Sequence, residues 1–185
     1  MYLADIAIKK CLKQGEIKII PEIDLKHVRP AGIRVHLAKK ILIPKPGQTV
    51  SLRSPGDLQY DEIDLSKKKF TLGSDGFILA STVEKIKTAS DILTFLDGRS
   101  TVARLGLTTH VTAGVIDGNH DDARSITLEI KNLGKFSVEL NEGDAIGLVL
   151  FAKMTDKIVQ PSQSQYAGQD GVVAPNLDFR PGVDS

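Results

Sequence analysis

Three blocks of sequence between residues 98 and 132 carry most of the information in this chain. They read GRSTVARLGL (98–107), TAGVID (112–117) and ITLEIKN (126–132). The first block brings two arginines and two hydroxyl residues together, the second ends in an aspartate, and the third holds one glutamate in a strand-like run. Cations and hydroxyls near two separate carboxylates suit a ligand with phosphates at one end and a reactive polar group at the other. The blocks therefore point to a nucleotide.

The composition limits the class of protein. The 185 residues are enough for one domain with a real core, and 41% hydrophobic with 25% charged residues are ordinary for a globular protein. The formal net charge of +1 argues against a protein that coats nucleic acid by electrostatics. No apolar run approaches the roughly 20 residues that cross a bilayer, and the first residues lack an export signal. We therefore expect a cytoplasmic protein that binds neither nucleic acid nor membrane.

Cys11 is the only cysteine in the chain. A single cysteine excludes an internal disulfide, which fits a reducing compartment. It also excludes the zinc site of the common nucleobase deaminases, which needs a Cys-x-x-Cys pair beside a further His or Cys. Any deamination by this chain must therefore proceed without zinc.

Short strands punctuated by glycine and proline predict a mainly β fold. Apolar residues at helical spacing from residue 4 to residue 12 predict one short N-terminal helix that ends at Gly15. Alternating patterns predict strands at 17–20, 33–38, 41–43, 50–52, 77–86, 126–131 and 145–151, and residues 90–93 fit a helical turn. We expect a β-barrel or β-sandwich behind the N-terminal helix.

The tail changes character at Val159, after which glutamine and serine dominate. Disorder is one interpretation of such a terminus. A mobile flap that closes over a ligand is the other. We expect residues 1–185 to form a single domain in which 159–185 are a flexible C-terminal lid.

The arginines of the first block have two interpretations. Arg99 and Arg104 offer guanidinium forks, while Ser100 and Thr101 offer hydroxyl and amide donors for phosphate oxygens. Gly98 permits close approach of the backbone. On an ordinary surface, however, the same arginines are simply solvated.

The two carboxylates are also open to two interpretations. Asp117 is either a turn residue in a polar loop or an acceptor for a sugar hydroxyl. Strand alternation puts Thr127, Glu129 and Lys131 on one face. Glu129 is then either a glutamate on the wet side of a sheet or a general acid and base in a cleft.

The longer sequence around these blocks resembles the dCTP deaminase family, which belongs to the trimeric dUTPase superfamily. The matching stretches are DGRSTVARLGL (97–107), HVTAGVID (110–117) and ITLEI (126–130). Further similarity lies in GEIKIIP (15–21), EGDAIG (142–147) and QYAGQDG (165–171). Nearly the whole chain is covered.

The resemblance implies a dUTPase-like β-barrel, or β-clip, that assembles as a homotrimer with active sites at subunit interfaces. It also implies a dCTP or dUTP nucleotide whose triphosphate carries a magnesium ion, with no metal ligand from the protein. Ser100 and Arg104 would hold phosphates and help position the catalytic water, and Glu129 would be the general acid and base. The implied substrate-binding set is Arg99, Ser100, Thr101, Arg104, Asp117, Thr127, Leu128, Glu129, Gln165 and Gln169.

The chain departs from the family pattern in the tail and after Asp117. Ser162 and Gln165 stand where the family usually has a tyrosine and a lysine, which removes phosphate-facing groups. The segment from Gly118 to Arg124 is about two residues longer than usual and lacks an aromatic residue. Its extra acids, Asp121 and Asp122, would repel an anionic ligand unless they point away.

Three functions fit these observations. The first is zinc-independent hydrolytic deamination of dCTP to dUTP and ammonia. The second is dUTP diphosphatase activity, alone or combined with deamination, because TAGVID resembles the dUTPase motif as well. The third is a nucleotide-binding trimer with weak or no catalysis, which the altered tail favours.

Overall fold

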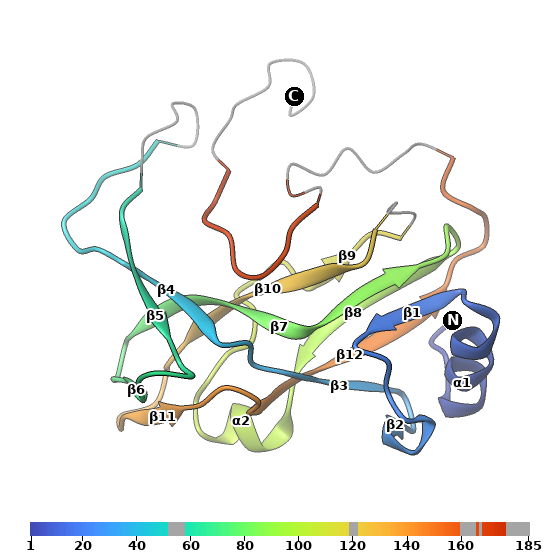
Figure 1. Ribbon diagram of the computed structural model, residues 1–185, viewed down its shortest axis with the longest axis horizontal. Coiled ribbons are helices and arrows are strands. Elements are labelled where there is room, and N and C mark those ends of the chain that lie inside the picture. Colours follow the sequence, from blue (N-terminus) through green and yellow to red (C-terminus); the bar gives the residue numbers. More distant parts are fainter. Residues whose placement is uncertain (52–57, 119–121, 160–165, 167, 177–185) are drawn as a thin grey trace.

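The computed structural model describes residues 1–51, 58–118, 122–159, 166 and 168–176. Two five-stranded sheets and a two-stranded ribbon make up the described fold, with a helix packed at one end (Figure 1). The helical elements are α1 (Asp5–Gln14), a 3₁₀ turn η1 (Leu25–His27) and α2 (Ser100–Arg104). The strands are β1 (Ile17–Ile20), β2 (Val28–Arg29), β3 (Gly32–His36), β4 (Lys40–Pro44), β5 (Tyr60–Asp64), β6 (Phe70–Leu72), β7 (Phe77–Thr88), β8 (Ile92–Gly98), β9 (Val115–Ile116), β10 (Arg124–Lys131), β11 (Val138–Leu140) and β12 (Ala145–Lys153).

The first sheet is organised around β7. Its first half pairs with β4, which continues to β5, and its second half pairs with β1. The other edge of β7 carries β10, in register from Lys131 opposite Phe77 to Arg124 opposite Ile86. A bulge interrupts this pairing, because only Ile126 faces the segment from Thr82 to Glu84. The Thr82 hydroxyl accepts the Ile126 N–H at 2.9 Å and so satisfies the backbone at the bulge.

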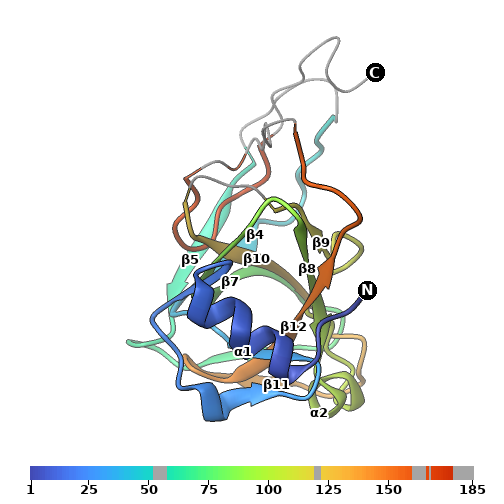
Figure 2. The same ribbon diagram turned by 90° about the vertical axis from the view of Figure 1, so that its right-hand side faces the viewer.

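The second sheet has the order β2-β3-β12-β8-β9, and all of its pairings are antiparallel. Its β9 is a short edge strand, and β10 pairs with β7 alone among the described strands. The edges of the two sheets therefore face one another at β9 and β10 without closing into a continuous ladder. Figures 1 and 2 show these two strands side by side beneath the C-terminal segment.

The core lies between the sheets, as the alternating sequence patterns predict. Ile33, Val35 and Leu37 are buried, whereas Arg34 between them is exposed. Helix α1 closes one end of this core with Ile8 and Cys11. The helix ends where predicted, because Gly15 adopts a left-handed φ of 74° and donates to the carbonyls of the last turn.

Some sequence-based expectations about local structure are wrong. Val50 is exposed and belongs to no strand, and Leu52 lies outside the described residues. Residues 90–93 form no helical turn, because Ile92 begins β8 and is fully buried. Residues 100–104 form α2, a short helix that the sequence pattern did not predict.

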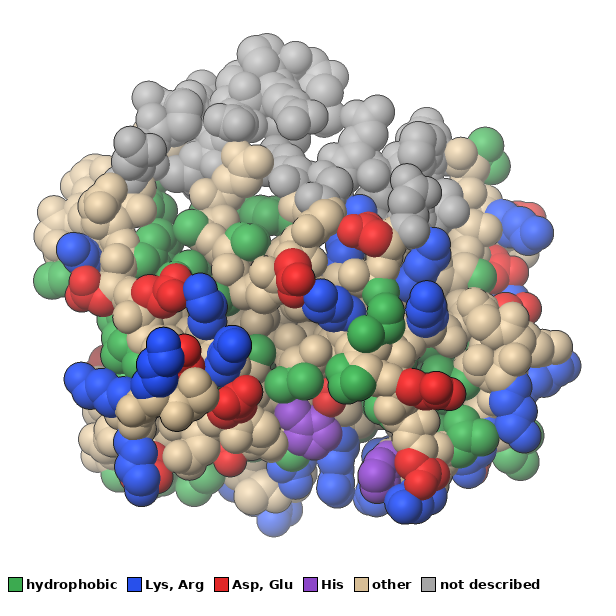
Figure 3. All heavy atoms as spheres, viewed as in Figure 1, with side chains coloured by type: hydrophobic (Ala, Val, Ile, Leu, Met, Phe, Trp, Pro, Cys, Tyr) green, Lys and Arg blue, Asp and Glu red, His purple; other side chains and the backbone are tan. Residues whose placement is uncertain are grey.

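None of the helices in the described ranges is long and apolar enough to cross a membrane, α1 being the longest at ten residues. On the face drawn in Figure 3, acidic and basic side chains are intermixed rather than gathered by sign. This mixture agrees with the small net charge of the sequence.

Candidate active site

A cavity of about 830 Å³ lies between β9, β10 and the C-terminal segment. Its volume suits a small-molecule ligand. The polar and charged side chains of its wall come from six separate parts of the chain, which only the tertiary fold brings together. They are Tyr60, Thr88, Thr94, Asp117, Arg124, Ser125, Thr127, Glu129, Tyr166 and Gln169.

Strand β10 supplies the centre of this wall. Its residues alternate as the sequence predicts: Thr127 and Glu129 reach the cavity, while Leu128 and Ile130 are completely buried in the core. Leu128 was expected to meet the ligand, but its side chain points into the core. Only its backbone is available to a ligand in the cavity.

The carboxylate of Glu129 is half-buried and held by the backbone. Its Oε2 accepts the N–H of Val111 at 3.1 Å. The Glu129 carbonyl accepts the hydroxyl of Thr108 at 2.9 Å, and that hydroxyl also accepts the Lys131 N–H. These contacts fasten segment 108–111 to β10, so the carboxylate has one fixed donor and its remaining lone pairs are available to a ligand.

The C-terminal segment 168–176 lies across the same face of β10. Gln169 donates to the Thr127 hydroxyl at 2.6 Å and to the Gly171 carbonyl at 3.0 Å, and Gly171 donates to Ser125 at 3.1 Å. Asp170 forms an ion pair with Lys85 of β7 at 2.8 Å. Gln169 therefore reaches the cavity as expected, whereas Gln165 lies outside the described residues.

Two tyrosines border the cavity beside this segment. Tyr60 reaches it from β5, and the Tyr166 hydroxyl accepts the Asn176 N–H at 3.1 Å. Burial raises the pKa of Tyr60, and the neighbouring Tyr166 adds to the rise. Tyr60 therefore remains a neutral hydrogen-bond donor at physiological pH.

The expected phosphate-binding residues lie elsewhere in the chain. Arg99, Ser100, Thr101 and Arg104 belong to α2 and its N-cap, and none of them lines the described cavity. Figures 1 and 2 both show α2 at the opposite end of the molecule from the C-terminal segment. Arg99 donates to the Ala145 carbonyl at 2.5 Å, whereas Ser100, Thr101 and Arg104 are exposed.

A family model described as dCTP deaminase-like matches residues 2–154 of the chain. The chain belongs to the dCTP deaminase-like family. The family resemblance inferred from the sequence blocks is thereby confirmed.

Individual relatives agree with the family match. The chain is 34% identical, over 91% of its length and 90% of the relative's, to a protein of Methanosphaera stadtmanae named dCTP deaminase, dUMP-forming. It is 33% identical, over the same shares of both chains, to a protein of Thermomicrobium roseum named dCTP deaminase.

The fold is likewise that of a known family member. The structure matches the 2'-deoxycytidine 5'-triphosphate deaminase of Agrobacterium tumefaciens with a TM-score of 0.62 at 20% identity. The match covers 81% of this chain but only 47% of the Agrobacterium chain. The expected mainly β, dUTPase-like architecture with a short N-terminal helix is confirmed.

Tyr60 and Arg124 are among the cavity residues that went unnoticed in the sequence. Tyr60 stands in a charged, turn-rich stretch that gave no sign of a ligand site. Arg124 precedes the apolar alternation of β10 and looks like an ordinary charged residue at the start of a strand. Its position where the loop after Asp117 returns to β10 was the one available signal.

Proposed function

We propose that this protein catalyses the hydrolytic deamination of dCTP. Glu129 carries the proposal, because its carboxylate lies in a cavity beside Thr127 and Gln169, which can bind a pyrimidine edge. The names of the relatives, all of which include dCTP deaminase, support the same substrate.

In the proposed reaction, water adds to C4 of the cytosine ring and ammonia leaves. Glu129 takes one proton from the attacking water and delivers it to N3. It then takes the second proton from the C4 hydroxyl of the adduct and passes it to the amino group, so that the C4–N bond breaks and ammonia leaves. One carboxylate can perform these transfers in sequence, and such catalysis contributes roughly 10²–10⁴ in rate. The Val111 N–H would hold the carboxylate in position during these steps.

The remaining site residues keep the roles that the resemblance implies. Asp117 would accept a hydrogen bond from the 3'-hydroxyl of the deoxyribose. Arg99, Ser100, Thr101 and Arg104 would bind the triphosphate. Because the two sets lie at opposite ends of one chain, they would meet only if α2 of a neighbouring subunit completes each site, as in the expected homotrimer.

Magnesium would arrive with the triphosphate. In the described ranges no three His, Cys, Asp or Glu side chains converge as a metal site. Magnesium prefers oxygen ligands and commonly combines phosphate oxygens with water. When bound, it would neutralise phosphate charge, and the chemistry at C4 would proceed without zinc.

Residues 159–185 would act as a lid. The contacts of segment 168–176 with Ser125 and Thr127 support this role, because they cover the cavity beside Glu129. A lid that excludes bulk water would strengthen the electrostatic interactions inside.

The two candidate reactions differ in the nucleotide that they release. The sequence prediction was dUTP, with combined deaminase and diphosphatase activity as the alternative. The name of the Methanosphaera stadtmanae relative includes dUMP-forming, which favours the alternative. A bifunctional enzyme would add a second water to the triphosphate and release pyrophosphate.

The test is incubation with dCTP and, separately, with dUTP, following ammonia and pyrophosphate. Ammonia without pyrophosphate supports a deaminase that forms dUTP. Ammonia together with pyrophosphate supports the dUMP-forming reaction. Absence of ammonia would contradict the proposed deamination and leave a nucleotide-binding or diphosphatase role.

A further inference from the structure

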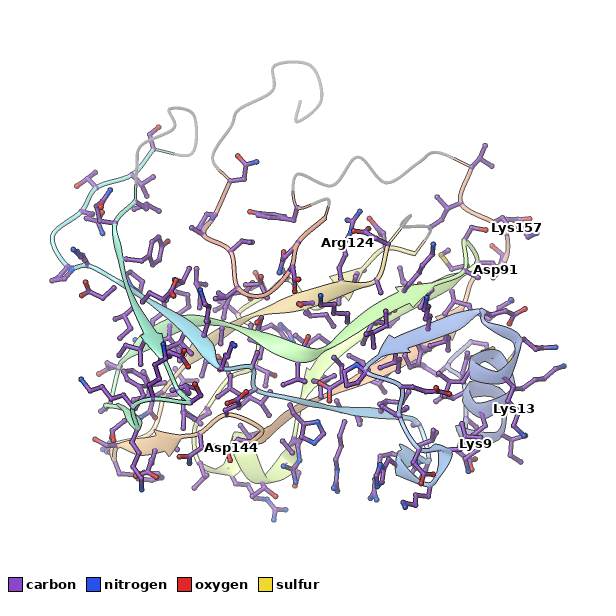
Figure 4. The ribbon with its side chains drawn as sticks, in the orientation of Figure 1. Lys9, Lys13, Asp91, Arg124, Asp144 and Lys157 are labelled. Atoms are coloured by element: carbon purple, nitrogen blue, oxygen red, sulfur yellow. The ribbon has the colours of Figure 1, made fainter. Side chains whose placement is uncertain are left out.

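Arg124 places a cation inside the cavity. Its side chain is only 14% exposed, and it is the one Lys or Arg among the described residues of the cavity wall. Figure 4 shows Arg124 where β9, β10 and the C-terminal segment meet. A buried guanidinium is costly unless its donors are satisfied.

Only one of the hydrogen-bond donors of the Arg124 guanidinium has a partner among the described residues. Its Nε donates to Asp122 Oδ1 at 2.9 Å, and Asp122 itself is 45% exposed. Among the described residues no other partner of the guanidinium is found. The two terminal NH₂ groups, which together provide four donors, therefore remain available in the cavity.

The position of Arg124 decides which part of a nucleotide it can reach. It lies five residues before Glu129 on one strand, a separation of roughly 16 Å along the backbone. The two side chains therefore cannot share one edge of a pyrimidine. The bulge between Ser125 and Thr127 interrupts the alternation of β10, and both Arg124 and Glu129 line the cavity.

We propose that Arg124 is a substrate-binding residue that contacts the phosphate chain of the nucleotide. The inference rests on the proposed function. Asp117 and Glu129 make the cavity wall anionic, so a phosphate chain passing them would be repelled without a cation nearby. A guanidinium with two free NH₂ groups matches phosphate oxygens better than an uncharged sugar.

Asp122 is then a positioning residue. By holding Nε, it would turn the two NH₂ groups toward the ligand. The lengthened loop after Asp117, whose acids were expected to repel a nucleotide, would thus contribute to binding through this pair.

The test compares binding of dCTP, dCMP and deoxycytidine by calorimetry in the wild type and in Arg124→Gln. We expect the variant to bind dCTP at least tenfold more weakly and deoxycytidine within twofold of the wild type. Arg34→Gln is the matched control, because Arg34 is an exposed arginine on β3 that does not line the cavity. Asp122→Asn should raise KM for dCTP by a smaller factor and leave kcat unchanged.

Equal dCTP affinity in the variant and the wild type would overturn the proposal, and so would equal losses for all three ligands. If Arg124→Gln does not fold, as judged by its thermal transition without ligand, Arg124→Lys serves instead. Lysine keeps the charge but loses the fork, so an intermediate loss specific to dCTP supports the proposal and an unchanged affinity overturns it. A wild type that binds no dCTP would instead refute the proposed function.

Discussion

The α2 end of the molecule is exposed and carries Arg99 and Arg104, whereas the cavity between β9 and β10 is concave and holds two carboxylates. Arg104 projects from a five-residue helix on the surface, while Glu129 lies half-buried on a sheet and accepts a backbone N–H. Both ends contain residues of the sequence blocks that resemble the family, yet neither end carries all of the residues expected to bind a nucleoside triphosphate. The contrast shows that blocks close together in sequence can lie at opposite ends of one folded chain.

The largest effect is expected from Glu129→Gln, which removes the proposed general acid and base from the cavity end. Glutamine keeps the shape of the side chain but cannot shuttle protons, so ammonia release should fall by roughly 10²–10⁴ while dCTP binding persists. Steady-state ammonia assays with parallel calorimetry measure both quantities. Turnover equal to that of the wild type would show that the cavity is not the place of chemistry.

Mixed assemblies test whether the two ends meet across subunits. Arg104→Ala and Glu129→Gln chains should each be nearly inactive alone. Co-expressed in equal amounts, they should recover roughly a quarter of wild-type activity, because random mixing in a cyclic trimer gives that share of sites both intact groups. The activity of the purified mixture is the measurement, and no recovery would mean that each chain carries its whole site.

Gln169→Ala should raise KM for dCTP moderately, because it removes a contact at the cavity end. It removes the 2.6 Å bond to Thr127, worth about 1 kcal/mol for a neutral pair, which corresponds to roughly a fivefold rise in KM for dCTP. Gln14→Ala, at the exposed end of α1, is the control. Equal KM values in the two variants would mean that the tail contact does not help binding.

The smallest expected effect is that of Tyr60→Phe, which tests whether the cavity buries the Tyr60 hydroxyl. Burial raises the pKa of Tyr60 above the usual value near 10, so its hydroxyl stays protonated in that range and ionises only at higher pH. The difference between wild-type and variant tyrosinate absorbance should therefore have its midpoint above pH 10. A midpoint near 10 would show that the phenol is as hydrated as that of a free tyrosine.

Much of the local structure was predictable because it follows from periodicity. The burial of Leu128 and Ile130 opposite Thr127 and Glu129 is a consequence of strand alternation. The end of α1 at Gly15 follows from the freedom of glycine at positive φ. The failures have a physical cause too: Ile92 satisfies a helical pattern locally, but pairing with Lys153 of β12 places it in a strand.

The candidate site was predictable as a set of residue types but not as an arrangement. The sequence blocks contained Asp117, Thr127, Glu129 and Gln169, which the fold gathers around one cavity. Tyr60 and Arg124 were missed because each becomes part of the wall only when distant segments approach. Nothing in their immediate neighbours distinguishes them from ordinary surface residues.

The sequence alone determined the family, the mainly β class and the identity of the acid on β10, because these depend on residue types at fixed spacing. Only the tertiary structure decided that α2 lies away from the cavity and that Arg124 enters the site with free donors. Spacing along a strand fixes which face a side chain takes. Which edges of two sheets come together depends on long-range packing, which local sequence does not encode.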